Sequence, residues 1–264
     1  MGLAFWGQNP SFFLIAFASA GCRIHSQAPY WIETHGEAVG LRIAGWSTGA
    51  LLLGPNQQLW IYPGGWSNPW PPQAHTHDLR AVAAANTTGY AIATDGRVLR
   101  FSDNRWFPYE GSAAWNASEI AATEDDKLLV LSDGKLRLFE HGQLLELGCD
   151  GVNGSAVAAA GPGQAYVLDQ QGALFLSADE RCDGIAAPTP LRRIAGRSDR
   201  LLGVGVDGSV WRRRGSTWTR LAAPHKYRPG QVARETRVQD VGVSAYSTWI
   251  IDSEGSVFLL SDEA

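Results

Sequence analysis

Few residues in this chain of 264 have the types and the spacing that catalysis or metal binding requires. His75-Thr76-His77-Asp78 brings two imidazoles and one carboxylate together on a short segment. A zinc site needs further ligands, and the neighbouring sequence offers none at a usual spacing. The sequence also has no nucleophile elbow, no phosphate-binding loop and no paired cysteine motif. We therefore expect no enzymatic activity, no cofactor and no bound metal.

Positive charge is concentrated in one segment and favours binding over catalysis. Residues 191–237 carry 12 of the 22 Lys and Arg but only three acidic residues, a net charge of +9, whereas the rest of the chain carries −13. Such an asymmetry attracts and orients an anionic partner. The candidate contacts are Arg212, Arg213, Arg214, His225, Lys226, Tyr227 and Arg228. The alternative is a solvated strand whose arginines pair with acids of a neighbouring repeat.

Six repeats of one pattern must position these side chains. Each repeat contains short strands, with Asp-Gly or a related pair in the turn between the second and the third. Successive turns are 39, 38, 38, 36 and 47 residues apart, a spacing typical of propeller blades. The turns are Asn56-Gln57, Asp95-Gly96, Asp133-Gly134, Gln171-Gly172, Asp207-Gly208 and Glu254-Gly255. The sequence predicts an all-β fold over residues 29–264, a six-bladed β-propeller with four-stranded blades.

The sixth repeat supplies only three strands. Residues 29–34 contain a Trp and match the missing outer strand. We expect this N-terminal segment to complete the sixth blade, because closure joins the two ends of the ring and removes an exposed sheet edge.

Propeller geometry also predicts one functional face. The turn after the second strand and the loop into the next blade should emerge together, on the face that carries residues 71–78 and 222–237. The second of these segments is the one large insertion and explains the 47-residue spacing. Inserted loops on repeat scaffolds commonly carry function, so we expect His225 and its neighbours to contact an anionic group; an incidental insertion is the alternative.

Residues 1–28 do not follow the repeat. An apolar run over residues 11–21 ends at Cys22 and has the length of a secretory signal's apolar region. Ser19-Ala20-Gly21 before Cys22 resembles a bacterial lipoprotein cleavage site, although the usual Leu is Ser19 and no Lys or Arg precedes the run. We expect lipidation of Cys22 and membrane anchoring. The alternatives are a simple secretory signal, an uncleaved anchor, or a buried N-terminal segment.

The two other cysteines, Cys149 and Cys182, fall near the outer strands of the third and fourth repeats. Neighbouring outer strands could bring them together in a disulfide, which suits an oxidising compartment; two unrelated buried thiols are the alternative. These signals predict the bacterial cell envelope, either periplasm or outer membrane with a lipid anchor, and the cytoplasm is the alternative.

The repeat has a Val/Ile-Ala/Gly start, an Asp-Gly turn, an aromatic third strand and a Trp opening the fourth. This pattern resembles tectonin-type propeller repeats and, more distantly, those of the regulator of chromosome condensation. The best match runs from Leu191 to Leu221, whereas repeats three and four have Leu144 and Arg181-Cys182 in place of the outer Trp. The resemblance implies non-enzymatic binding of glycans, bacterial surface lipids or proteins, and it assigns no site residue.

Two binding functions remain. One is an interaction scaffold for a protein partner with an acidic surface, as a complex subunit or as an inhibitor of the immunity type; the other is a lectin-like binder of glycan or anionic lipid. A multivalent lectin repeats its site residues from blade to blade, whereas these repeats share packing residues and differ in their loops. This difference favours one asymmetric interface and a protein partner. Nucleic acid becomes a candidate only if residues 1–28 are not an export signal.

Overall fold

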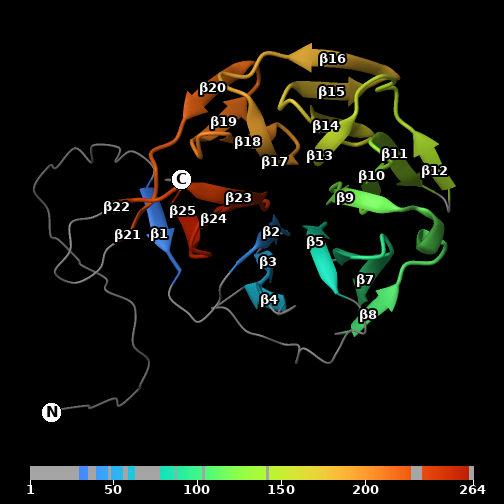
Figure 1. Ribbon diagram of the computed structural model, residues 1–264, viewed down its shortest axis with the longest axis horizontal. Coiled ribbons are helices and arrows are strands. Elements are labelled where there is room, and N and C mark those ends of the chain that lie inside the picture. Colours follow the sequence, from blue (N-terminus) through green and yellow to red (C-terminus); the bar gives the residue numbers. More distant parts are fainter. Residues whose placement is uncertain are drawn as a thin grey trace, which may run out of the picture.

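The computed structural model describes residues 30–34, 40–46, 49–55, 59–62, 78–86, 88–102, 105–140, 143–226 and 234–261. Six antiparallel sheets stand radially around a central axis and form a closed ring (Figure 1). The sequence prediction of a six-bladed β-propeller is confirmed.

Each blade is built outward from the axis in chain order, except that the outer strand of the sixth blade is the N-terminal one. The inner strands are β2 (Arg42–Gly45), β5 (Leu79–Ala84), β9 (Ala117–Ala122), β13 (Gly154–Gly161), β17 (Leu191–Arg197) and β23 (Val238–Val243). The second strands are β3 (Ala50–Leu53), β6 (Gly89–Ala93), β10 (Leu128–Ser132), β14 (Gln164–Asp169), β18 (Arg200–Gly205) and β24 (Thr248–Asp252). The third strands are β4 (Leu59–Tyr62), β7 (Val98–Ser102), β11 (Lys135–Glu140), β15 (Leu174–Ala178), β19 (Val210–Arg214) and β25 (Val257–Ser261).

The outer strands are β8 (Arg105–Pro108), β12 (Gln143–Glu146), β16 (Arg181–Ile185), β20 (Thr217–Arg220) and β1 (Tyr30–Glu33). The outer strand that the repeat pattern predicts for the first blade lies outside the described residues. A short hairpin, β21 (His225–Lys226) and β22 (Arg234–Glu235), belongs to the insertion between blades five and six. In the part of the chain that the structure describes, Ser112–Ala114 forms a 3₁₀ turn, and no residue lies in an α-helix.

The N-terminal strand closes the ring as predicted. Strand β1 pairs antiparallel with β25, with Trp31 opposite Leu260 and Glu33 opposite Phe258. Thr34 extends the pairing, because its main-chain N–H and its hydroxyl both donate to the carbonyl of Val257 at 2.9 Å. The last blade therefore contains strands from both ends of the propeller, which join the ring through main-chain hydrogen bonds.

The core is divided among the six contacts between neighbouring blades. Each adjacent pair of blades encloses one cluster of buried apolar side chains. Trp60, Trp106 and Trp218 pack against three of these clusters, as their place in the repeat predicts. Burial of apolar area between blades is the main force that holds such a ring together.

The turns between second and third strands link each blade to the next. Their Gly residues have positive φ, between 76° and 85°, a conformation that glycine adopts without steric cost. The carbonyl of each Gly accepts a hydrogen bond from a main-chain N–H at the start of the next blade. The described pairs are Gly96 with Ala117, Gly134 with Gly154, Gly172 with Leu191, Gly208 with Val238 and Gly255 with Gly40. These bonds fix the turns and the starts of the inner strands on the same side of the ring, which we call the turn face.

Candidate functional site

The predicted contact residues of β19 do not gather on one surface, because successive side chains of a strand point to opposite faces of its sheet. Arg213 Nη1 donates to the Tyr166 hydroxyl of blade four at 3.2 Å, and its guanidinium lies 5.9 Å from the centre of that ring. Arg212 is in register with Leu202, whose side chain belongs to the cluster between blades five and six. Arg214 is exposed at the end of β19 far from the turn face. A role for these arginines as partner contacts stays a prediction.

The insertion contributes an internal ion pair. Lys226 Nζ lies 2.9 Å from Asp252 Oδ2 and 2.7 Å from Glu254 Oε2, which attaches the β21–β22 hairpin to the turn of blade six. Burial by itself lowers the pKa of Lys226, but the hydrogen bonds to Glu254 and Asp252 raise it above its ordinary value. His225 is half exposed, 3.9 Å from Glu235. Lys226 is thus engaged within the protein, while Tyr227 and Arg228 lie outside the described residues.

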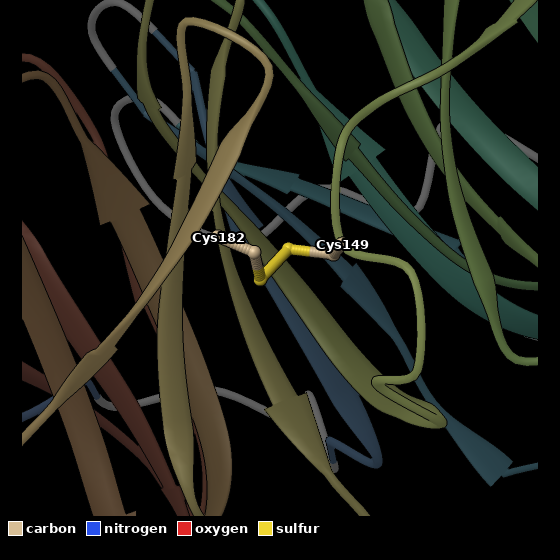
Figure 2. The surroundings of a disulfide bond; sticks show 2 residues. All are labelled: Cys149 and Cys182. Carbon is tan, nitrogen blue, oxygen red and sulfur yellow. A yellow bond between two sulfur atoms is a disulfide. The ribbon is translucent and has the colours of Figure 1, made fainter.

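Cys149 and Cys182 form a disulfide (Figure 2). Cys149 follows β12 of blade three, and Cys182 lies in β16 of blade four, so the bond joins the rims of two neighbouring blades. These are the two blades that lack an outer Trp. Cys22, like His75 and His77, lies outside the described residues.

The inner strands surround a narrow central channel. Its middle is lined by one small residue from each blade: Ala44, Ala83, Ala121, Ala158, Ala195 and Gly242. The open volume of the channel is about 90 Å³, enough for only a few water molecules. A chain segment or a sugar does not fit inside, so a ligand has access only to the ends.

A layer of charge lies between this small-residue belt and the turn face. The six inner strands place Arg42, Ala81, Glu119, Ala156, Arg193 and Asp240 at one equivalent position. Glu119 Oε1 lies 3.4 Å from Arg42 Nη2 and 3.2 Å from Arg193 Nη1. Asp240 Oδ2 accepts a hydrogen bond from the Ile43 N–H at 3.0 Å. Two cations and two anions therefore balance one another across the channel.

Burial sets the acid–base properties of both carboxyl groups. It raises the pKa of Glu119 above the ordinary value, and Arg42 and Arg193 oppose this effect. Burial likewise raises the pKa of Asp240, again against the attraction of the two arginines. Removal of the Glu119 carboxylate would leave the half-buried guanidinium groups of Arg42 and Arg193 without their ion-pair partner.

A second layer, one residue nearer the turn face, is set by β-bulges. In five inner strands the pairing register shifts at an equivalent residue. The residues skipped in the register are Arg80, Ser118, Ser155, Arg192 and Gln239. A bulge leaves its extra residue out of the ladder and redirects its side chain, and bulges are common beside binding sites. The bulges in β5 and β17 direct the side chains of Arg80 and Arg192 to the end of the channel.

The channel opens on the turn face into a cavity of about 430 Å³. We call its lining the arginine mouth: Leu41, Arg42, Leu53, Leu79, Arg80, Arg192, Arg193, Gln239 and Ser253. Arg42 and Arg193 share Glu119, but neither Arg80 nor Arg192 forms an ion pair with any described residue. The Nη2 groups of Arg80 and Arg192 donate to the carbonyls of Ala117 and Val238, respectively. Among the described residues, the mouth therefore carries two guanidinium groups that form no ion pair.

Two further observations describe the electrostatics of this mouth. The Nε of Arg80 is buried and has no hydrogen-bond partner among the described residues. Burial lowers the pKa of Arg192 from its ordinary value, Arg193 and Arg237 lower it further, and the attraction of Asp240 only partly opposes these effects. A site that disfavours its own cations in this way gains free energy when an anion enters.

At the opposite end of the channel, side chains from three blades are bonded to one another. Arg197 is buried, and its Nε lies 3.0 Å from Glu124 Oε1, while its Nη2 donates to Asn86 Oδ1. The Ser198 hydroxyl also donates to Glu124 Oε1, at 2.6 Å. These groups connect blade five with blades two and three, and their charges are paired, in contrast to Arg80 and Arg192 at the turn face.

Sequence reasoning missed the residues of the mouth, although a signal was present. The repeats begin with Leu41-Arg42-Ile43, with Arg192-Arg193-Ile194 and with Gln239-Asp240-Val241. When the repeats are aligned on the branched residue (Ile43, Ile194 or Val241), the two positions before it hold all the charged residues of the channel end. A count of charges along residues 191–237 does not distinguish the arginines inside the ring from those on its rim.

Within the described ranges, no group of three or more His, Cys, Asp or Glu side chains is placed to bind a metal ion. None of the helical structure in the described part of the chain is long and apolar enough to cross a membrane.

No protein-family model and no curated protein matches this sequence. Solved structures with the same architecture do. YCF48 bound to D1 peptide is 11% identical with a TM-score of 0.57, over 91% of this chain and 99% of that one. Virginiamycin B lyase from Staphylococcus aureus is 10% identical with a TM-score of 0.56, over 89% of this chain and 99% of the lyase.

Yeast RCC1 (Prp20), in its complex with Kap60, is 13% identical with a TM-score of 0.54, over 82% of this chain and 68% of that one. The likeness is one of fold. At these identities the neighbours support a propeller repeat protein, and they include both partner-bound proteins and an enzyme.

Proposed function

We propose that this protein is a non-enzymatic binding scaffold whose propeller engages a protein partner through the arginine mouth. The observation that carries the proposal is the pair Arg80 and Arg192, two cations that form no ion pair with any described residue and line an open cavity of about 430 Å³. A partner with an acidic surface would supply the missing counter-charge.

The neighbours support partner binding as a use of this architecture, since YCF48 is seen with a D1 peptide and RCC1 with Kap60. The chemistry of the mouth supports the non-enzymatic reading. Its nine lining residues include no His, Cys or Lys, and the two carboxylates behind it are held by arginines or by main-chain N–H groups. A general acid or base needs a group that is free to exchange its proton with a substrate.

The cellular setting is part of the proposal. Cys22 after an apolar run suits an exported lipoprotein of the bacterial envelope, in the periplasm or on the outer membrane. The disulfide between Cys149 and Cys182 supports an oxidising compartment, since such bonds are rare in the cytosol. In this setting the propeller would act as a subunit of an envelope complex or as an inhibitor of the immunity type.

Affinity capture from the native host tests this function. The full chain, the double variant Arg80→Glu/Arg192→Glu and the control Arg214→Glu are compared, with mass spectrometry of the bait's N-terminus and of captured proteins. We expect a stoichiometric protein partner on the wild type and on the control but not on the double variant. Equal capture by all three chains would show that the mouth is not the interface.

A second candidate function, lectin-like glycan binding, is favoured by a groove at the rim between blades two and three. The groove has a volume of about 710 Å³ and is lined by Arg100, Phe107, Tyr109 and Phe139, among others. Phe107 is 46% exposed, and the rings of Tyr109 and Phe139 lie 5.1 Å apart. Exposed aromatic faces beside polar groups are suited to sugar rings. Binding of the wild type to a glycan array, with loss of binding in Phe107→Ala, would support this function. If the wild type bound no glycan, this function would be excluded.

A further inference from the structure

The lining of the arginine mouth identifies the kind of group that it accepts. Arg80 and Arg192 come from blades two and five, on opposite sides of the ring, and both line the same cavity. One small anion cannot place itself beside both if they remain apart, whereas a ligand with two or more anionic groups can. Planar guanidinium groups bind carboxylates through paired N–H donors.

The other lining residues distinguish between classes of polyanion. Leu41, which is 44% exposed, brings apolar surface into the mouth, while Leu53 and Leu79 form its buried wall. Gln239 and Ser253 bring amide and hydroxyl groups. No aromatic side chain is among the nine lining residues. Single-stranded nucleic acids and sugars are bound largely by stacking on aromatic rings, so this lining suits neither. A peptide segment combines carboxylates, apolar groups and main-chain polar groups, and it matches all three kinds of lining residue.

We infer that the mouth binds an acidic peptide segment that lies across the channel end and places carboxylates against Arg80 and Arg192. This inference rests on the proposed function, because the segment would belong to the protein partner. The segment does not pass through the ring, since the channel volume is only about 90 Å³.

Glu119 competes with the segment for the two remaining arginines. Its Oε1 lies within 3.4 Å of Arg42 and Arg193, which both line the mouth. A ligand carboxylate that approaches these guanidinium groups is repelled by the negative charge of Glu119. Glu119 is therefore an internal counter-ion that stabilises the empty ring and weakens binding, so its removal should change stability and affinity in opposite directions.

Fluorescence anisotropy on the full chain tests the inference, with labelled hexaglutamate as the probe and hexaglutamine as its uncharged control. In Arg80→Gln/Arg192→Gln, loss of two charge-assisted contacts should weaken hexaglutamate binding at least about tenfold. Arg214→Gln removes the same charge on the far side of the ring and should leave the affinity unchanged. Glu119→Gln should bind several-fold more tightly while its thermal midpoint falls. Raising the salt concentration should weaken every one of these interactions.

Arg80 and Arg192 also donate to carbonyls of other strands, so Arg80→Lys/Arg192→Lys serves as a second variant. It keeps the charges but loses the planar donor pairs, and we expect affinity between those of the wild type and the Gln variant. Equal hexaglutamate binding by the wild type and all variants would overturn the inference, as would weaker binding in Glu119→Gln. Tighter, mouth-dependent binding of an oligonucleotide or a sulfated glycan would assign the mouth to another class. If the peptide does not bind but capture of a protein still requires Arg80 and Arg192, this inference fails and the proposed function stands.

Discussion

Reduction of the disulfide between Cys149 and Cys182 gives a prediction whose size can be worked from the structure. The bond joins residues 33 apart in sequence and ties the rims of blades three and four. The two cysteines also pack against the cluster between these blades, whose outer strands lack the Trp found elsewhere. We expect the disulfide to hold the rims of blades three and four together, where other blades use the packing of an outer Trp.

The closed loop fixes the expected magnitude. The chain-entropy relation for a loop of 33 residues gives about 3.7 kcal/mol at 25 °C. For a protein of this size, each kcal/mol shifts the thermal midpoint by roughly 2–4 °C, so reduction should lower the midpoint by about 7–15 °C. Entropy lost by the unfolded chain accounts for the effect, which therefore does not require a change in the native blades.

Thermal unfolding by circular dichroism, with and without reductant, measures this shift on one and the same sequence. Free-thiol titration establishes that Cys149 and Cys182 are reduced before heating. The variant Cys149→Ala/Cys182→Ala is the control, and its midpoint should be low and insensitive to reductant. Equal midpoints for the oxidised and the fully reduced wild type would refute the reasoning.

Three further predictions follow from the closure, the turns and the buried acids. A chain that begins at residue 35 should unfold at a clearly lower temperature than one that begins at residue 29, because only the first lacks β1 and exposes the edge of β25; equal midpoints would contradict the closure. Gly172→Ala should cost about 1–3 kcal/mol more stability than Gly151→Ala. Both glycines have positive φ, but only at Gly172 would the new Cβ lie 2.4 Å from the Leu191 carbonyl oxygen. Urea unfolding measures the difference, and equal losses of stability would show that the backbone moves to remove this clash. Burial raises the pKa of Asp240 in the folded chain, whereas in the unfolded chain this pKa is near the ordinary 3.8. As the pH rises from 3.8 through the raised pKa, the wild type should therefore lose stability relative to Asp240→Asn. A difference in unfolding free energy that stays constant from pH 4 to 7 would show that the pKa is not raised.

The fold could be predicted from the sequence because its determinants recur. Turn glycines such as Gly96 and Gly208 mark five of the six repeats at similar spacing, and the sixth repeat needs a strand that residues 29–34 supply. Repetition makes weak local signals add together. Blade number, strand order and closure followed from that addition.

The mouth could not be predicted by the same reasoning, because it is the part of each repeat that does not recur. One equivalent position holds Arg193 in one blade, Glu119 in another and Ala156 in a third. The bulge that turns Arg80 into the mouth is a property of strand pairing, which composition does not reveal. Conversely, the Arg212–Arg214 run was conspicuous in the sequence, but strand alternation directs its members to different surroundings.

The ion pairs across the channel have a consequence for how the ring unfolds. In an array of repeats where each unit contacts only its neighbours, local opening at one unit leaves the distant ones intact, and cooperativity decays along the array. Here Glu119 joins blade three to blades one and five, and Arg197 joins blade five to blades two and three. Separation of one blade from its neighbour would also disturb contacts between blades that do not touch along their faces. The ring should therefore lose its structure as a single unit, which gives a circular array of weakly similar repeats the sharp transition of a small globular domain.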